Sequence, residues 1–379
     1  MKKLLYLCSF LVKGWEVSIL LLLPYIQLQQ QISIAQVGLL SAVLSVFQIF
    51  SNLFSGHFAE KFGNKKVISF ALFVFGLAWL TIAVQANILL MILVYACAGI
   101  GVGLFNPLAN SLVAKMADTN RGKAMGNFSA VTDVGRVIAS SLTAFLLAAV
   151  SYKYLSLGYA LVTFAIVILF FTIKQNFSKE KDKSELQKIK IVSLLRDKKY
   201  IYSILTGMCD SFASASLYIF IPLLLVPKGI DFTTTGVLTA LFFAGYMSGR
   251  LLLGRVADKH GFGRTLIVAE IAMALFILLL VVVKSVVLVA ITIFLLGIFT
   301  RGTSPIIRAM VAEAVSEKER FDKAYSFYSF SVNSSSVISR PIFGFLAAII
   351  GISSVFYLAS FVCLVAIVPI LQYTKLQKQ

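Results

Sequence analysis

Two pairs of opposite charges lie inside apolar segments and are the residues best placed to do chemistry. Lys13 and Glu16 stand three positions apart, and Asp133 and Arg136 repeat the same spacing in another segment. Residues three apart share one face of a helix, so each acid can neutralise its basic neighbour. A charge inside a bilayer costs roughly 2.5–3.5 kcal/mol on insertion scales, so such residues usually face the protein interior and have a function. Both pairs are candidates for binding a charged substrate or an ion.

Depth along the segments supports this interpretation. At 1.5 Å per residue, Glu16 lies about 18 Å and Asp133 about 15 Å from the start of its segment, near the centre of a bilayer. Asp210 lies at a similar depth in a later segment, without a partner nearby in the sequence. Arg301 also interrupts an apolar segment. Arg340 lies in a serine-rich one, where the serines either line a pathway or pack helices together.

Two other charges lie closer to segment ends. Arg250 and Glu270 stand within about two helical turns of a predicted membrane edge. Long charged side chains in such places can extend to the interface while their stems stay in apolar surroundings. We expect them to reach the membrane edge or to support a nearby loop.

The composition predicts what must position these residues. Of the 379 residues, 59% are hydrophobic and 13% charged, and the mean hydropathy is +0.92. A soluble domain carries about 25% charged residues. The chain is therefore predicted to be an integral membrane protein surrounded by a lipid bilayer.

Several other classes of protein are disfavoured. The four cysteines stand singly, without metal or redox spacing. No glycine-rich phosphate loop ending in lysine occurs, and no nucleophile–base cluster suggests an enzyme. The net charge of +18 comes from bases scattered over short loops rather than from one patch, which argues against nucleic acid. We expect no metal, no cofactor and no direct use of ATP.

Spanning a bilayer core of about 30 Å takes about 20 helical residues. Twelve apolar segments of that length are predicted, because lipid offers backbone groups no hydrogen-bond partners. They run near 4–28, 36–58, 67–86, 88–114, 123–149, 154–173, 200–226, 233–255, 265–283, 285–307, 323–349 and 352–373. The sequence thus predicts an all-α membrane protein with bundles at 1–173 and 200–379, joined by a polar linker at 174–199.

The distribution of basic residues predicts the orientation. Loops on the side of the N-terminus, with both tails, hold 26 of the 34 Lys and Arg residues. The opposite loops hold Lys153, Lys228 and Lys284. By the positive-inside rule, both termini and the linker are cytoplasmic.

Two polar loops, Gly56–Lys66 and Gly254–Arg264, are copies of one pattern at an offset of 198 residues. Each has a glycine predicted to end a helix, an acid four residues later, a base, and a glycine turn. Prolines and glycines repeat elsewhere at the same offset, as Pro24 with Pro222 and Gly99 with Gly297. The two bundles are therefore predicted to be parallel repeats. The buried charges do not repeat, since Ser214 stands opposite Glu16 and Ser331 opposite Asp133.

With this duplication, the chain resembles the major facilitator superfamily of transporters, and in particular its bacterial small-molecule efflux permeases. The second loop matches the family signature well, while the first has Glu60 for aspartate and Asn64 at a usually basic position. In the family this loop forms a charged latch at the cytoplasmic gate. The resemblance assigns that role to Gly56, Glu60, Lys61, Gly63, Gly254, Asp258, Lys259, Gly261 and Arg264.

The resemblance also implies which helices line the cavity. In the family the first, fourth, seventh and tenth helices do so most directly, which adds Tyr95 and Asn106 to the candidates. The substrate- and ion-coupling set is then Lys13, Glu16, Tyr95, Asn106, Asp133, Arg136, Asp210, Arg301 and Arg340. Tyr95 stands where drug exporters of the family often carry an arginine, which weakens the analogy with their proton coupling.

The function that these features imply is secondary transport by alternating access in the cell membrane of a bacterium. We expect proton-driven efflux of a small organic molecule by a monomer, with protons, substrate and lipid as its partners. Uptake of a metabolite by symport is the alternative within the class. A sensor or scaffold that transports nothing is the alternative outside it.

Overall fold

The computed structural model describes residues 2–29, 32–82, 87–115, 121–172, 196–315 and 321–377. Within these ranges every regular element is a helix and no strand occurs. Twelve spans among the described residues are long and apolar enough to cross a membrane, which confirms the predicted number and the all-α class. Most of the predicted linker at 174–199 lies outside the described residues.

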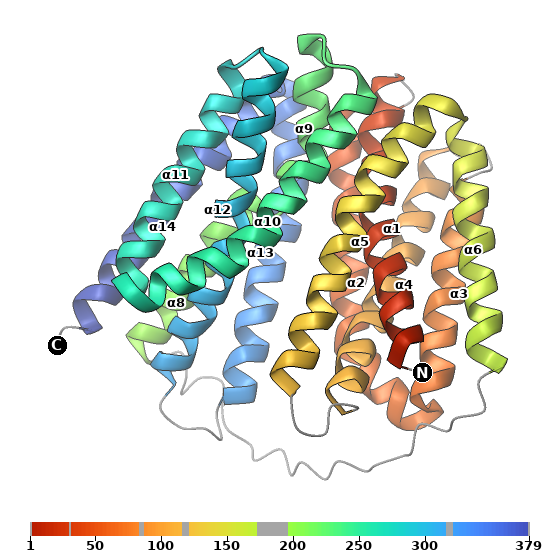
Figure 1. The fold of residues 1–379 in the computed structure, drawn as a ribbon, viewed down its shortest axis with the longest axis horizontal. Helices are drawn as coiled ribbons and strands as arrows, with labels where there is room; N and C mark the ends of the chain where they lie inside the picture. Colours follow the sequence, from red (N-terminus) through yellow and green to blue (C-terminus); the bar gives the residue numbers. More distant parts are fainter. Residues whose placement is uncertain are drawn as a thin grey trace. The chain divides into compact units, whose positions relative to one another are not determined.

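The chain divides into two compact units, of which unit 1 is drawn in Figure 1 mainly in red to yellow-green and unit 2 in green to blue. Unit 1 holds the first six spanning helices and also residues 232–240. Its helices are α1 (Lys2–Leu28), α2 (Ile34–Phe62), α3 (Asn64–Ile82), α4 (Ile88–Lys115), α5 (Arg121–Ala149) and α6 (Tyr152–Thr172). Within this unit α1 packs along α5, and α4 packs between α2 and α3.

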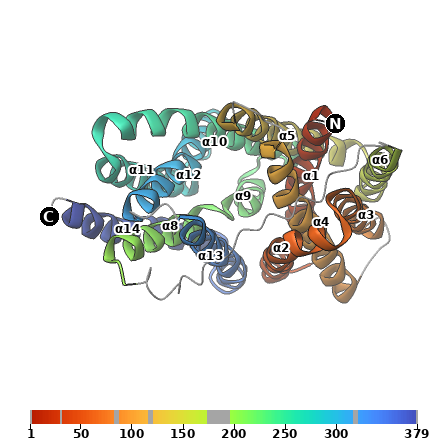
Figure 2. The same ribbon diagram turned by 90° about the horizontal axis from the view of Figure 1, so that it is seen from below.

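Unit 2 holds the other six spans, except for the start of α10. Its elements are α8 (Lys198–Ser214), α9 (Leu217–Leu225), the short 3₁₀ turn η1 (Val226–Lys228), α10 (Phe232–His260), α11 (Phe262–Val282), α12 (Val286–Ala314), α13 (Phe321–Ile349) and α14 (Ser353–Gln377). In this unit α8 packs against α12, α13 and α14, and α11 packs against α12 and α14. Figure 2 shows α8 beside α13 and α14 when the helices are viewed end on.

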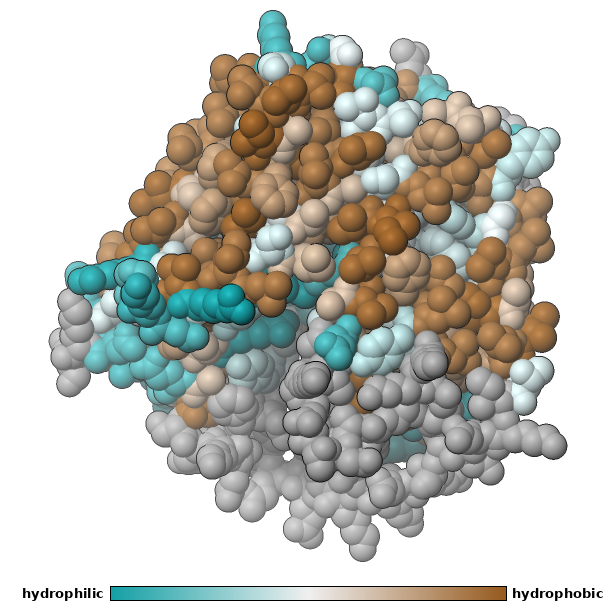
Figure 3. Space-filling model, viewed as in Figure 1, coloured by the Kyte–Doolittle hydropathy of each residue, from teal (hydrophilic) through white to brown (hydrophobic). Residues whose placement is uncertain are grey.

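Large apolar side chains cover the outer surfaces of both units. Phe145 in unit 1 and Leu251 and Val268 in unit 2 are each more than half exposed. Figure 3 shows such side chains over much of the face it draws, with hydrophilic ones gathered towards the ends of the helices. An apolar surface of this extent suits helices that are surrounded by lipid rather than water.

The duplication is visible in the helix boundaries. Helix α10 begins and ends 198 residues after α2, and the starts of α3 and α4 recur at the same offset in α11 and α12. A Cβ atom added at Gly99 would meet the backbone oxygen of Leu44, and one added at Gly297 would meet that of Phe242. Leu44 and Phe242 are themselves 198 residues apart, so the close helix contact repeats as well.

The two copies of the loop pattern are shorter than predicted. Helix α2 continues to Phe62 and α3 begins at Asn64, so that Gly63 alone separates them. The prediction that Gly56 and Gly254 end helices is wrong, because both lie inside helices. The polar residues that follow them are compatible with a helix that extends beyond the apolar segment. The reversal itself needs only one residue at positive φ, which is +87° at Gly63 and +86° at Gly261.

The seventh span differs from its counterpart α1. Helix α1 is continuous around Pro24, whereas the seventh span breaks between Ser214 and Leu217 and continues as α9. The break falls in the run Ser211–Ser216, which is rich in serine. Serine side chains compete with the helix for backbone hydrogen bonds, which makes such a run a favourable place for an interruption.

Candidate functional site

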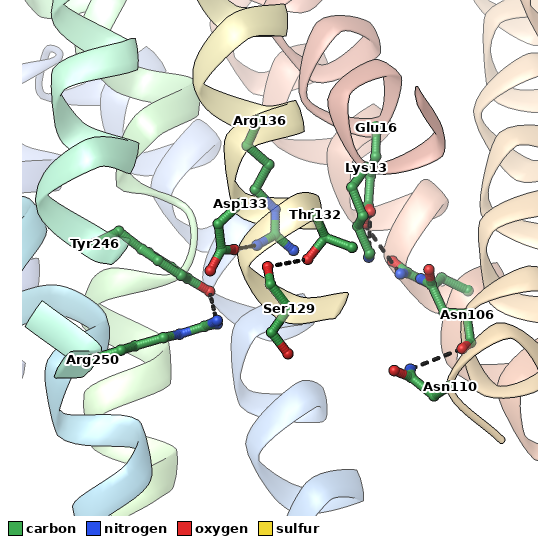
Figure 4. A network of polar contacts seen from close by, with 11 residues as sticks. Lys13, Glu16, Asn106, Asn110, Ser129, Thr132, Asp133, Arg136, Tyr246 and Arg250 are labelled. Atoms are coloured by element: carbon green, nitrogen blue, oxygen red, sulfur yellow. Dashed lines mark hydrogen bonds and ion pairs between the residues drawn. The ribbon is translucent and has the colours of Figure 1, made fainter. Parts of the chain in front are cut away.

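The ion pairs predicted in unit 1 are present. The Lys13 Nζ donates to Glu16 Oε2 at 2.6 Å, and the two side chains are only 15% and 16% exposed. The Arg136 Nη1 donates to Asp133 Oδ1 in the same i, i+3 arrangement. Figure 4 shows both pairs, one on α1 and the other on α5. The charge of Arg136 also acts on Glu16, so the four residues form one electrostatic network, here called the unit 1 network.

Small residues on α1 and α5 bring the two pairs together. A Cβ atom added at Gly14 would meet Gly135 and Ala139, and one added at Gly135 would meet the backbone oxygen of Phe10. The two helix backbones can therefore approach each other more closely than larger side chains would allow. Because Gly14 lies beside Lys13, and Gly135 beside Arg136, the same contact that packs the helices positions the charges.

Gln48 on α2 completes the surroundings of Glu16 and was missed from the sequence. Its Nε2 donates to Glu16 Oε1 at 3.2 Å, so both oxygens of the carboxylate accept a hydrogen bond. An amide in the middle of the apolar segment 36–58 was the signal that could have identified it.

The two lining candidates on α4 have different surroundings. Tyr95 is buried, and its hydroxyl donates to the backbone oxygen of Ile19 at 2.8 Å, which ties α4 to α1. Asn106 is half-buried, and its backbone oxygen accepts a hydrogen bond from Asn110 at 2.8 Å (Figure 4). In this structure the Tyr95 hydroxyl therefore stabilises the contact between α4 and α1, while Asn106 is partly accessible.

Unit 2 arranges its buried charges differently. Asp210 on α8 is 3% exposed, and its Oδ1 accepts a hydrogen bond from the Thr303 hydroxyl on α12 at 2.8 Å. The charge of Arg301 acts on this carboxyl group, but within the described residues Asp210 forms no ion pair. Within the described residues, Asp210 and Arg301 thus belong to one site but form no ion pair.

Two arginines of unit 2 instead contact one tyrosine. The guanidinium carbon of Arg250 lies 4.5 Å from the ring centroid of Tyr246, and that of Arg301 lies 5.8 Å from it. Arg250 also donates to the Tyr246 hydroxyl at 2.7 Å, as Figure 4 shows. A cation over an aromatic face is stabilised by roughly 0.5–1 kcal/mol or more. Tyr246 was missed from the sequence; it stands 198 residues after Gln48, at the equivalent place in the second half.

Arg340 lies beside the break in the seventh span. It is buried, and its Nε donates to the Ser216 hydroxyl at 3.3 Å. Ser216 is also 3.2 Å from Ser339, so serines of α13 and of the break share a polar contact. These contacts join α13 to the break, and the two alternatives left open for this serine-rich helix both stay predictions.

Of the two roles expected for Glu270, extension to the membrane edge is wrong, while support of the nearby loop stays a prediction. Its side chain is 0% exposed and lies on the same face of α11 as Leu266, Met273 and Ile277, which are also buried. Helix α11 begins at Phe262, three residues before the predicted start, so Glu270 is about 12 Å along it. A fully apolar membrane segment does not reveal from its sequence which face is buried, and this is why the position was misjudged.

Apart from Lys65, which is half-buried, the charged residues of the two motif turns are exposed. Within the described part of the chain, Glu60, Asp258 and Arg264 form no ion pair, and Lys61 lies 5.4 Å from the ring of Phe62. The latch role of these residues therefore stays a prediction. What the structure does establish is the repeated backbone turn, in which the N–H groups of Gly63 and Gly261 each donate to the oxygen four residues earlier at 2.8 Å.

A comparison of the sequence with known families decides its identity. The sequence model described as Major Facilitator Superfamily matches residues 4–226 and 203–377, which together cover nearly the whole chain. The chain belongs to this superfamily. It is accordingly a multi-pass protein of the cell membrane and a transporter, which confirms the predicted family.

Relatives and solved structures agree with this assignment. An uncharacterized MFS-type transporter of Yersinia pestis is 26% identical over 322 residues, covering 83% of this chain and 81% of the relative. The structure of the nucleoside transporter NupG superposes with a TM-score of 0.85 at 14% identity, covering 98% of this chain and 99% of that one. The D-xylose-proton symporter reaches a TM-score of 0.77 at 14% identity, covering 97% and 96%. At such identities the two structures establish a shared fold.

Proposed function

We propose that this superfamily member moves a small organic molecule across the cell membrane in exchange for protons, and so exports it. Proteins of this superfamily carry out secondary transport by alternating access, in which two halves rock around a central site. The proposal concerns the coupling ion, the direction and the residues. The observation that carries it is the unit 1 network, in which partly buried charges meet at the packed faces of α1 and α5.

The contacts of Glu16 suggest how a proton could be coupled to movement. The carboxylate is held by the Lys13 ammonium and by the Gln48 amide, which lie on two different helices. A proton on Glu16 would remove the negative charge that both groups bind and leave Lys13 without its counter-ion. Breaking a buried pair in this way costs about 3 kcal/mol or more, which is enough to favour a second conformation. Asp133 and Arg136 are arranged in the same way.

The charges also suggest the class of substrate. Arg250 and Arg301 in unit 2 and the paired cations of unit 1 suit an anionic or zwitterionic compound. With 32 Phe and 14 Tyr in the chain, a compound with apolar parts would also find partners. Asp210, Arg301, Arg340 and Asn106 are proposed as further contacts of the substrate or the ion, with Tyr95 supporting α1.

We further propose that the motif turns at Gly63 and Gly261 and both chain termini face the cytoplasm. The chain is proposed to work as a monomer. Its two bundles, at 1–173 and 200–379, are proposed to be joined by the linker at 174–199. The support for the orientation is the excess of Lys and Arg on that side of the predicted spans.

Uptake by proton symport is the second candidate. One structure with the same fold is a D-xylose-proton symporter and another is a nucleoside transporter. The same carboxylates could serve either direction, since the direction depends on whether proton and substrate are bound together or in turn.

Proteoliposomes with an entrapped pH indicator test the proposal. After a pH gradient is imposed, nucleosides, sugars, amino acids and lipophilic amphiphiles are added one at a time. Export by exchange predicts that a transported compound moves against the proton flow, whereas symport predicts movement with it. Transport that does not depend on the gradient contradicts proton coupling, and no transport of any compound favours the sensor hypothesis.

A further inference from the structure

We propose that Asp210 and Glu270 hold one proton between them, in a binding site formed entirely by unit 2. The site joins α8, which carries Asp210, to α11, which carries Glu270. It rests on the proposed proton coupling and adds to Glu16 of unit 1 a second place that can hold a proton.

Both carboxyl groups of the proposed site are buried. Glu270 is 0% exposed and Asp210 is 3% exposed, so neither carboxyl group is in contact with bulk water. Among the described residues, no N–H or hydroxyl donor satisfies either oxygen of Glu270. An ionised carboxylate in such a place is very costly, and a neutral, protonated one is much less so.

The neighbours of Glu270 do not compensate for a negative charge. The group that interacts with it most directly is the carboxyl group of Asp210, which is itself acidic. From the other packed helices, the thiols of Cys209 on α8 and Cys363 on α14 lie within electrostatic range of the pair. Two interacting, buried carboxyl groups cannot both be ionised without a large penalty, and such pairs take up and release protons as a unit.

The basic and hydroxyl groups near the pair all act on the Asp210 side. Thr303 of α12 donates to Asp210 Oδ1, and the charges of Arg301 and Asp210 interact. Tyr328 of α13 also lies within electrostatic range of Asp210. The Thr303 hydroxyl and the charge of Arg301 favour a negative charge on Asp210 rather than on Glu270. The proton is therefore placed on Glu270, facing an ionised Asp210, with which it can form a charge-assisted hydrogen bond.

A metal ion is a poor alternative occupant. In the described part of the chain, no group of three or more His, Cys, Asp or Glu side chains is arranged to hold one. A hard cation would need several oxygen ligands, and the groups that accompany the two carboxyls are a hydroxyl and two thiols.

The duplication shows that the helix packing does not require this pair. At the offset of 198, Val12 stands opposite Asp210, Leu72 opposite Glu270 and Phe105 opposite Thr303. The same positions in unit 1 are thus filled by apolar residues that are all buried. Two acids at places where apolar residues suffice for packing point to ligand binding.

Infrared difference spectroscopy of the full-length protein in membranes tests the site, with protons, deuterium oxide and sodium chloride as the probes. At neutral pH we expect the carbonyl band of a protonated carboxyl group. The frequency of this band should shift in deuterium oxide and should not change when sodium chloride is added. Glu270→Gln should abolish the band, because Asp210 is then ionised alone beside Thr303 and Arg301. Asp210→Asn should keep the band at a shifted frequency, because Glu270 stays protonated.

Glu313→Gln is the matched control, since Glu313 is an exposed carboxylate on α12 that accepts hydrogen bonds from Tyr373 and Gln377. Its band pattern should equal that of the wild type. A wild-type protein without the protonated band overturns the proposal even if a variant fails to fold, and so does a band that survives Glu270→Gln or that responds to sodium. The spectra require no transport, so a failure here is separable from a failure of proton coupling in liposomes.

Discussion

The two units share a backbone plan but not their buried charges. Helix boundaries, the glycine turns at Gly63 and Gly261, and the close contacts at Gly99 and Gly297 all repeat at an offset of 198 residues. Unit 1 neutralises its acids with bases one helical turn away, as ion pairs. Unit 2 places two acids together and directs two arginines at a tyrosine.

This difference teaches which features belong to the fold and which to the activity. A turn or a close helix contact is needed in both halves, because both halves must pack and pivot in the same way. A buried charge has no such need, because serines stand opposite Glu16 and Asp133, and apolar residues stand opposite Asp210 and Glu270. Predictions that treat equivalent positions of the two units in parallel therefore test the account most sharply.

The largest effect is expected at Glu16. Glu16→Gln should abolish transport and destabilise the protein by about 3 kcal/mol or more, because Lys13 keeps its charge but loses its counter-ion. The measurements are flux into proteoliposomes and thermal unfolding in detergent. Adding Lys13→Met should restore stability but not transport. Ser214→Ala, at the equivalent position of unit 2, should leave both unchanged, and a transport defect of equal size there would contradict the comparison.

A large effect on stability is expected where α1 meets α5. Gly135→Leu should lower the free energy of unfolding by about 1–3 kcal/mol or more, since the new side chain meets the backbone of Phe10. The equivalent residue of unit 2 is Asn333, which is exposed, so Asn333→Leu should be nearly neutral. Thermal unfolding of the two variants side by side measures the difference. Equal losses would show that the glycine contact is not special to unit 1.

The two turn glycines should respond alike. Gly63→Ala and Gly261→Ala each place a Cβ atom on a backbone at φ near +87°, which costs on the order of 1–3 kcal/mol. Because the two turns have the same geometry, the losses of stability in thermal unfolding should agree within error. A loss at one turn alone would mean that the two copies are not mechanically equivalent.

The smallest effect is expected at Thr303. Thr303→Val removes the hydroxyl that donates to Asp210 and should cost about 1 kcal/mol of stability. It should also alter the infrared band assigned to Glu270, because the charge on Asp210 is less well stabilised. Thr300→Val on the same helix, whose hydroxyl bonds only a backbone oxygen of its own helix, is the control. An unchanged band in Thr303→Val would weaken the proposed placement of the proton.

The sequence predicted most of the fold because hydropathy and glycine patterns report directly on lipid contact and on turns. The twelve spans, the ion pairs of unit 1 and the reversals at Gly63 and Gly261 follow from residue spacing alone. The site in unit 2 did not follow. Asp210 and Glu270 stand 60 residues apart, and only the packing of α8 against its neighbours brings their side chains together.

The errors have the same physical origin. Glu270 was expected at the membrane edge because an apolar helix gives no sign of its buried face. Gln48 was missed because its partner Glu16 lies on another helix, and the contact of Tyr246 with Arg301 joins two helices in the same way. The pattern of apolar residues within one segment predicts the structure of that segment. Contacts between segments require the assembled structure.

The measurement that tests the central claim most directly compares Glu16→Gln with Glu270→Gln in two transport modes. One mode is driven by a pH gradient, and the other is exchange of a radiolabelled compound across the membrane without a gradient. We predict that Glu16→Gln loses both modes of transport, because it leaves Lys13 without its counter-ion. Glu270→Gln should lose the mode driven by the pH gradient and keep the exchange, because it removes only the proposed proton site of unit 2. Identical behaviour of the two variants would contradict a division of roles between the two units.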